Sequence, residues 1–197
     1  MTGDGAAPPS LPSPLAAARR RILIVGVTGS GKSTLAGQLG RHAGLRVHLA
    51  DEEIGWLPGW VQRDPAEQRR MALERAAAPE WVFDSAYGHY HQELAARAEL
   101  IVCLDYPRLV SLGRLVLRSL RRVTQAEPVC NGNVETWAQL FSRDSILLWH
   151  ARSFGGKRQR MRSLLETYGP HKVLVFRCPR QTARWLRGVK ATGRVPG

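Results

Sequence analysis

The sequence predicts one α/β domain, built on a parallel β-sheet with helices on both faces. Five short apolar runs are rich in Val, Ile, Leu and Phe and do not alternate with polar residues, the pattern of strands that are covered on both faces. Helical segments separate these runs, which implies βαβ units with right-handed crossovers. A length of 197 residues suits a single domain with its own core.

The expected elements alternate from residue 21 onward. The strands are expected at Arg21–Val25, Arg46–Ala50, Trp81–Asp84, Leu100–Asp105 and Val173–Phe176. The helices are expected at Lys32–Ala43, Pro65–Ala77, His91–Ala98, Arg108–Arg122, Val134–Ser153, Lys157–Thr167 and Arg180–Gly188. The helix from Pro65 has the strongest start signal, with Asp64 as N-cap, Pro65 at its first position and Glu67 as a capping-box glutamate.

Two turn-rich segments, Glu52–Gln62 and Val123–Asn133, interrupt this alternation. Irregular segments of this kind in a tight α/β chain are either substrate loops and lids or plain surface loops. The first 18 residues contain four prolines and no basic n-region, so we expect a flexible tail and not a signal peptide. The domain is then expected over residues 19–190, followed by a flexible C-terminal tail over 191–197.

Cysteine usage and hydropathy bear on the location of the protein. Cys103, Cys130 and Cys178 form no CxxC pair, so they are expected to be reduced thiols in a cytoplasmic protein. No apolar run approaches the roughly 18 residues that a membrane span needs. We therefore expect no membrane association.

The net charge of +13 is concentrated in two regions. Residues 108–162 hold 11 Lys and Arg against 3 Asp and Glu, and residues 177–194 hold 6 against none. A basic surface fits nucleic acid, an acidic membrane or a site that grips polyphosphate. The basic runs lack the interleaved aromatic residues of surfaces that stack nucleic-acid bases, which favours nucleotide phosphates.

One motif is strong: residues 26–33 match the pattern GxxxxGK[ST]. The loop follows an apolar strand and opens an amphipathic helix, which is the context that a phosphate-binding P-loop requires. Its glycines let backbone N–H groups converge on an anion, the lysine reaches the β- and γ-phosphates of ATP, and the serine hydroxyl binds Mg²⁺. The residues expected to hold the nucleotide are Gly26, Thr28, Gly29, Ser30, Gly31, Lys32, Ser33 and Thr34.

The rest of the chain resembles the adenylate kinase and shikimate kinase branch of P-loop kinases. It is most similar to the bacterial FlaR-like group, also called DNA topology modulation proteins. The resemblance covers roughly residues 20–188 and includes the Asp51 strand end, the Trp56–Trp60 segment, the stretch from Val82 to Tyr87, and Leu104-Asp105-Tyr106-Pro107. Where the closest relatives have Asp-Gly-Asn-Tyr, this chain has Asp-Ser-Ala-Tyr over residues 84–87. The resemblance implies a three-layer P-loop NTPase fold, sheet order 2-3-1-4-5, and a lid at about 119–150.

The resemblance also implies roles for two acidic strand ends. Asp84 matches the aspartate that, with Ser33, orders magnesium. Asp51 matches a position that grips an acceptor hydroxyl or the metal, although an aspartate here can also merely cap a turn. Arg114 matches an adenine-stacking residue and Arg118 a phosphate contact, unless both belong to a solvated basic face. Pro179 is the expected second wall of the adenine slot.

Phosphoryl transfer also needs a cation near the transferring group. The candidates form a basic cluster: Arg152, Lys157, Arg158, Arg160 and Arg162. Arg158 and Arg162 are i,i+4 partners, so we expect that pair to face the site. On the acceptor side, the aromatic residues Trp56, Trp60 and Tyr87 can either sandwich a base or sugar or pack in a loop base.

These residues predict an ATP- and Mg²⁺-dependent kinase for a small acceptor such as a nucleotide, nucleoside or hydroxylated metabolite. The alternative is an ATP-binding regulator associated with nucleic acid, which the charge favours and the lack of a nucleic-acid-binding motif disfavours. The oligomeric state does not follow from the sequence.

Overall fold

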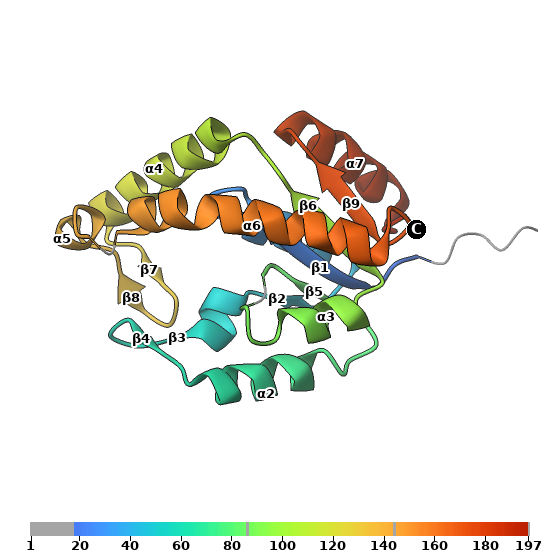
Figure 1. Cartoon of the computed structure of the whole chain (residues 1–197), viewed down its shortest axis with the longest axis horizontal. Helices are drawn as coiled ribbons and strands as arrows, with labels where there is room; N and C mark the ends of the chain where they lie inside the picture. The colour runs from blue at the N-terminus through green and yellow to red at the C-terminus, as the bar shows by residue number, and fades with distance from the viewer. Residues whose placement is uncertain (1–17, 86, 144, 197) are drawn as a thin grey trace, which may run out of the picture.

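A computed structural model of the chain describes residues 18–85, 87–143 and 145–196; the expected tail lies outside them except for Ala18. Five parallel strands form the central sheet in the order β2-β5-β1-β6-β9, as Figure 1 shows. Their bounds are β1 Arg21–Gly26, β2 Val47–His48, β5 Trp81–Phe83, β6 Leu100–Leu104 and β9 Val173–Phe176. Counted along the chain, these strands have the predicted order 2-3-1-4-5.

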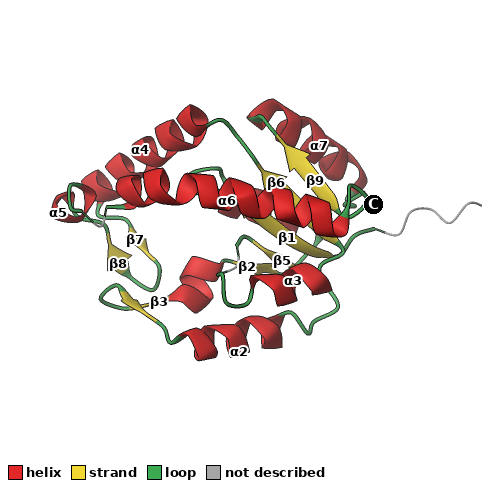
Figure 2. Cartoon of the chain, viewed as in Figure 1, coloured by secondary structure: helices red, strands yellow, loops and turns green. Residues whose placement is uncertain are grey.

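Helices cover both faces of this sheet (Figure 2). Their bounds are α1 Lys32–Ala43, α2 Pro65–Arg75, α3 His91–Arg97, α4 Arg108–Gln125, α5 Trp137–Leu140, α6 Ile146–Tyr168 and α7 Pro179–Thr192. One buried cluster joins Phe83 to Leu94 of α3 and Met161 of α6. The other joins Ile24 to residues of α1 and α7 such as Leu39. The alternating sides of each strand thus feed two separate apolar layers, which confirms the predicted α/β class.

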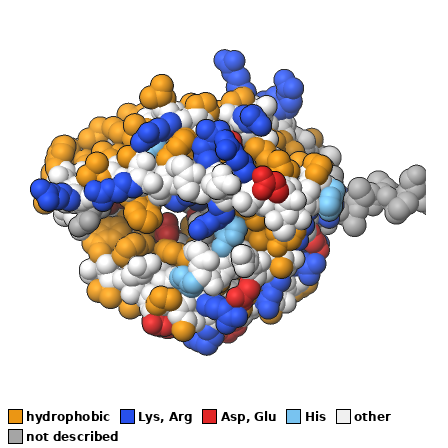
Figure 3. Space-filling view, in the orientation of Figure 1, with side chains coloured by type: hydrophobic (Ala, Val, Ile, Leu, Met, Phe, Trp, Pro, Cys, Tyr) orange, Lys and Arg blue, Asp and Glu red, His pale blue; other side chains and the backbone are white. Residues whose placement is uncertain are grey.

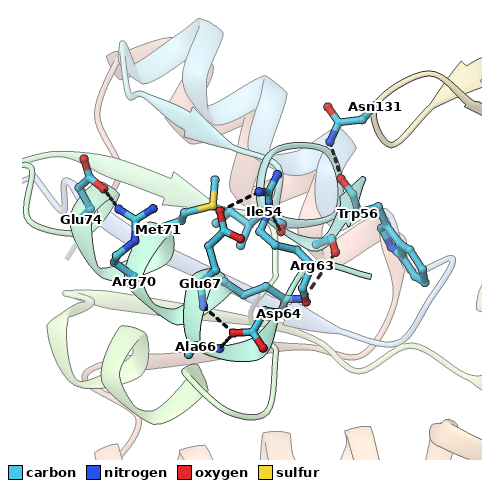
Figure 4. A network of polar contacts seen from close by, with 12 residues as sticks. Ile54, Trp56, Arg63, Asp64, Ala66, Glu67, Arg70, Met71, Glu74 and Asn131 are labelled. Atoms are coloured by element: carbon cyan, nitrogen blue, oxygen red, sulfur yellow. Dashed lines mark hydrogen bonds and ion pairs between the residues drawn. The ribbon is translucent and has the colours of Figure 1, made fainter. Parts of the chain in front are cut away.

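The N-terminus of α2 forms as the sequence predicts, with one difference. The Asp64 side chain accepts hydrogen bonds from the backbone N–H groups of Ala66 and Glu67 (Figure 4). The Glu67 carboxylate does not complete a capping box, because it accepts a hydrogen bond from Arg63 at 2.9 Å. Arg63 also donates to the carbonyl of Ile54, so this arginine ties α2 to the segment that follows β2.

The segment after β2 differs from the predicted strand Arg46–Ala50. β2 is only two residues long, and a π-helical turn, η1, occupies Asp51–Gly55. Carboxylates replace a strand partner here: Glu53 accepts from the N–H of Leu49 at 3.1 Å, and Asp84 accepts from the N–H of Ala50 at 2.8 Å. The chain then forms a small hairpin of β3 (Trp56–Leu57) and β4 (Val61–Gln62).

The region from 123 to 168 departs furthest from the sequence analysis. A second hairpin, β7 (Pro128–Val129) and β8 (Asn133–Val134), follows α4. The predicted helix Val134–Ser153 is wrong, because Thr136 caps the short α5 and Ser145 caps the start of α6. The predicted break before Lys157 is also wrong, since α6 continues through two glycines, at 155 and 156. Packing of α6 against α4, β1 and β9 offsets the cost of about 1 kcal/mol for each glycine.

The C-terminal segment packs onto the domain. α7 continues to Thr192, and Val195 is buried and accepts a hydrogen bond from the N–H of Arg19 at 3.0 Å. Residues 191–196 therefore belong to the packed domain, in contrast to the flexible tail expected over 191–197. None of the helices in the described ranges is both long and apolar enough to cross a bilayer.

Candidate active site

The candidate site lies at the carboxyl ends of the parallel strands. The loop after β1 meets Asp84 at the end of β5 and η1 after β2 at this edge. In the space-filling view, the surface is hollowed below the N-terminal half of α6, and red carboxylate atoms lie inside the hollow (Figure 3). Open α/β sheets bind their ligands at this edge.

The loop after β1 is shaped as a phosphate cradle. Gly29 and Gly31 have φ values of 79° and 95°, in the left-handed region that favours glycine. A Cβ atom on Gly29 would lie 2.3 Å from the carbonyl oxygen of Ser111, so the loop also packs against α4. No side chain caps the N-terminus of α1, and its first turn holds no acidic residue. The hydroxyl of Ser30 is buried without a partner. Free donors at a helix N-terminus fit the phosphates of ATP.

Lys32, Ser33 and Asp84 meet behind this cradle. The Lys32 ammonium donates to the carbonyl of Val27 at 3.2 Å, and the Ser33 hydroxyl donates to Asp84 at 2.5 Å. Burial lowers the pKa of Lys32 and raises that of Asp84. The described residues contain no cluster of three His, Cys, Asp or Glu side chains able to hold a metal. A hydroxyl and a carboxylate are hard oxygen ligands that suit Mg²⁺, which in such sites takes its remaining ligands from phosphate and water.

Asp51 faces this group from the start of η1. Its carboxylate accepts a hydrogen bond of 2.6 Å from the Tyr87 hydroxyl. Burial and then the charge of Asp51 raise the pKa of Tyr87. The same charge acts to raise the pKa values of Lys32 and Arg118. Asp51 therefore lies near cations at the strand ends, and a residue that merely capped a turn would not need these neighbours.

The cation that α6 brings to the P-loop is Lys157. Its ammonium donates to the hydroxyl of Thr28 at 3.0 Å. Burial, and then the charge of Lys32, lower the pKa of Lys157 to about 8. Lys157 is among the candidate cations of the sequence analysis, which favours Arg158 and Arg162 for this position.

The choice of Arg158 and Arg162 is not supported by their placement. Arg158 forms a two-pronged ion pair with Asp105, at 2.6 and 3.0 Å, and Arg162 lies exposed on α6. The physical reason is helical phase. The buried Met161 and Leu164 follow Lys157 by four and seven residues, so Lys157 shares the inward face. The shared face of Lys157, Met161 and Leu164 can be predicted only if a single helix is assumed to continue through the two glycines before Lys157.

Arg114 contacts the P-loop, Arg118 is electrostatically close to Lys32 and Asp51, and Pro179 lies at the start of α7. Arg114 donates to the carbonyl of Ser30 at 3.2 Å, and its guanidinium lies 5.5 Å from the Tyr106 ring centre. Arg118 is half-buried, and its Nε atom has no partner. Burial and then the charge of Arg122 lower the pKa of Arg118. Pro179 begins α7, which a 2.5 Å hydrogen bond between Thr182 and Tyr106 joins to the loop after β6.

Trp56 and Trp60 lie where the two hairpins meet. The Asn133 amide accepts from the N–H of Trp60 at 2.8 Å and donates to the carbonyl of Leu57 at 3.0 Å. The Trp60 indole donates to the carbonyl of Val134, and Asn131 donates to the carbonyl of Trp56 (Figure 4). We call this set of contacts between the β3–β4 and β7–β8 hairpins the hairpin bridge.

Beside the hairpin bridge, a 2.6 Å hydrogen bond from the N–H of Cys130 to Glu52 joins the β7–β8 hairpin to η1. The Trp60 indole N–H takes part in the hairpin bridge through its hydrogen bond to Val134. The Trp56 ring packs edge to face against the Trp60 ring, with 5.7 Å between the ring centres. The structure thus gives Trp60 a structural role, places Trp56 against the Trp60 ring and places the Tyr87 hydroxyl on Asp51.

No protein-family model matches the sequence, and no curated protein matches it significantly. Solved structures match over most of their length. The shikimate kinase of Acinetobacter baumannii in complex with shikimate superposes with a TM-score of 0.56, at 15% identity over 88% of this chain and 94% of the other. The shikimate kinase of Bacteroides thetaiotaomicron gives 0.52, at 16% identity over 88% and 98%. A gluconokinase from Sinorhizobium meliloti 1021 gives 0.50, at 16% identity over 88% and 90%.

The chain shares its α/β fold with these kinases. At these identities the likeness concerns the fold alone, and function rests on the site. In that fold, the site of this chain combines a phosphate cradle, a hydroxyl–carboxylate pair for a hard cation, a second carboxylate, and two lysines. This set of groups can bind a nucleoside triphosphate and orient a second molecule toward its last phosphate.

Proposed function

We propose that this protein is an ATP- and Mg²⁺-dependent phosphotransferase for a small hydroxylated or phosphorylated acceptor, such as a nucleotide, nucleoside or hydroxylated metabolite. The observation that carries the proposal is the position of Asp51: its carboxylate accepts a hydrogen bond from the Tyr87 hydroxyl, and its negative charge acts to raise the pKa values of both Lys32 and Lys157. Phosphoryl transfer depends on positioning and on cations around the moving group, and this arrangement supplies both.

Each group at the site has a role in this reaction. The acceptor oxygen attacks the γ-phosphorus, the bond from that phosphorus to the β,γ-bridging oxygen breaks, and ADP leaves. Asp51 orients the acceptor hydroxyl and takes its proton. Lys32 and Lys157 offset the negative charge on the transferring phosphoryl group. Ser33 and Asp84 would hold Mg²⁺, which would offset negative charge on the triphosphate.

The remaining residues bind the two substrates. Arg114 and Pro179 flank the adenine side, and Arg118 contacts phosphate. Trp56 and Tyr87 line the acceptor side. The lid expected at about 119–150 would include the β7–β8 hairpin and α5, and the hairpin bridge joins the first of these to the β3–β4 hairpin. The described cysteines are free thiols, which supports the expected cytoplasmic location.

The test is coupled ADP release with Mg·ATP against a panel of nucleoside monophosphates, nucleosides, polyols and hydroxy acids. One acceptor should raise ADP release far above background, and Lys32→Ala should abolish that increase. Asp51→Asn should lower kcat by about 10²-fold or more. Asp64→Asn makes the same chemical change at the N-cap of α2, where Asn caps equally well, and should leave kcat unchanged. If no acceptor stimulates turnover while ATP binds, the phosphotransferase proposal fails.

A second candidate function is an ATP-binding regulator that associates with nucleic acid, as the resemblance to DNA topology modulation proteins implies. One observation favours it: the outer face of α7 exposes Arg180, Arg184, Arg187 and Lys190. No carboxylate of the described chain forms an ion pair with these four side chains, whereas the arginines of α2 have such partners. A row of unpaired cations attracts a phosphate backbone.

A salt-dependent gel shift with duplex DNA tests this second candidate. The double variant Arg184→Ala and Arg187→Ala should weaken binding and reduce its salt dependence. The control double variant changes Arg69 and Arg70 to Ala, which removes the same charge from α2. Equal binding by both variants, or no binding at physiological salt, excludes this candidate.

A further inference from the structure

A cavity of about 540 Å³ lies between α3 and α6, on the face of the sheet that the two helices cover. In Figure 1, α6 lies above α3. Residues of both helices line it, among them His91, Gln92, Arg160, Ser163, Leu164 and Tyr168. None of these six residues belongs to the phosphate cradle described above.

The charge of this cavity is unbalanced. Arg160 lines it and has no ion-pair partner among the described residues. The single carboxylate of the lining, Glu93, is already paired with Arg69 of α2 at 2.8 Å. His91 is buried, its Nε2 atom has no hydrogen-bond partner, and burial together with the nearby Arg160 lowers its pKa to about 4. At neutral pH the lining therefore holds one uncompensated guanidinium beside an uncharged imidazole.

The remaining lining suits the body of an organic anion. Ser163, Thr167 and Gln92 supply hydroxyl and amide hydrogen-bonding groups, while Ala95, Ala96 and Leu164 are apolar. A guanidinium beside neutral donors favours a phosphate or carboxylate, since both accept two parallel hydrogen bonds from its planar fork.

One end of the cavity adjoins the candidate active site. Gly88 lines it, and a Cβ atom on Gly88 would lie 3.5 Å from Nη2 of Arg160. Gly88 follows Tyr87, whose hydroxyl donates to Asp51. Arg160 is also one helical turn from Lys157, which contacts the P-loop. A group bound at Arg160 would therefore lie next to the loop that holds Tyr87 and Gly88, on the helix that carries Lys157.

We propose that the cavity between α3 and α6 is a second ligand site, which binds a phosphate or carboxylate group at Arg160. The group comes either from the far end of an acceptor that extends out of the active site or from a separate small anion. The first source rests on the proposed phosphotransferase function, whereas the second does not.

The first experiment measures anion binding alone. The protein is saturated with Mg·ADP, so that the P-loop is filled, and is titrated with inorganic phosphate or malonate at constant ionic strength, with the melting temperature as readout. The wild type should show a saturable rise, and Arg160→Gln should weaken the apparent affinity by about tenfold or more. Arg162→Gln, two residues further along α6, is exposed like Arg160 but lies outside the cavity lining, and it should behave as the wild type.

The second experiment compares acceptors. For an acceptor that extends into the cavity, Arg160→Gln should raise KM about tenfold or more for an anionic compound and leave its neutral amide or ester analogue unchanged. An effect in the titration alone identifies a separate anion as the source, and an effect on KM alone identifies the acceptor. If Arg160→Gln matches Arg162→Gln in both experiments, the proposal is overturned. If no acceptor is found, the phosphotransferase proposal fails and the titration alone decides this one.

Discussion

The contact between Lys157 and the P-loop predicts a pH dependence that few other groups in this chain can produce. Lys157 lies 3.0 Å from the Thr28 hydroxyl, and burial lowers its pKa to about 8. The ammonium form is the one that offsets charge on the transferring phosphoryl group. Raising the pH should therefore remove the catalytic charge well before an ordinary lysine would lose its proton.

The size of the effect follows from the pKa. With a value of about 8, roughly nine-tenths of Lys157 is protonated at pH 7 and roughly one-tenth at pH 9. Because kcat/KM reports the free enzyme, it should fall about tenfold over that interval. Bound triphosphate stabilises the ammonium, so the fall in kcat should be displaced to higher pH.

The assay is steady-state ADP release from pH 6.5 to 9.5 for the wild type and for Lys157→Arg. Arginine stays charged throughout, so the variant should show a flat kcat/KM profile even if its rate is lower. Lys32 also has a lowered pKa, and it is present in both proteins. A fall that persists in Lys157→Arg, or a flat wild-type profile, would refute the assignment of this role to Lys157.

Three further predictions concern stability. The folded-state pKa of His91, about 4, lies below its unfolded value of 6.5, so unfolded chains bind more protons between these values and stability is lost as pH falls through them. Between pH 7 and 3.5, the free energy of unfolding measured in urea should fall by about 3 kcal/mol more for the wild type than for His91→Gln, and equal falls would contradict this. Gly29→Ala should lower the free energy of unfolding by more than about 1 kcal/mol and abolish ATP binding. Its control, Gly113→Ala on α4, adds a Cβ atom in open space and should raise the free energy of unfolding by about 0.5–1 kcal/mol. Gly155→Ala with Gly156→Ala should stabilise α6 by about 1–2 kcal/mol, and a lower melting temperature would show that the glycines are required there.

The sheet and its flanking helices could be predicted because their signals are local. Buried strands such as β6 are continuous apolar runs, and α1 lies between a phosphate-loop glycine and Gly44, so its bounds were predicted to the residue. The two hairpins and η1 have no local sequence signal of this kind. Side chains that accept from or donate to a distant backbone fix them, as Asn133 does for Leu57 and Trp60. Such pairings do not appear in a sequence window.

The candidate site divides in the same way. The phosphate cradle follows from one contiguous motif, and its glycine geometry confirms the reason for the motif. Which cation of α6 faces the P-loop depends on helical phase. Because a helix break was wrongly predicted before Lys157, Arg158 was favoured from the sequence. An error of one position on a helix moves a side chain by about 100° and exchanges a P-loop contact for an ion pair with Asp105.

The hairpin bridge has a consequence for how this protein can diverge. Asn133 contacts three backbone atoms, the carbonyls of Leu57 and Cys130 and the N–H of Trp60, and these contacts do not depend on the identity of the partner residues. Substitutions at Leu57 therefore place no compensating demand on position 133. In an alignment of relatives, the two hairpins should show little covariation although they touch, and the residues whose side chains make the bridging hydrogen bonds, Asn133, Asn131 and Trp60, should resist replacement.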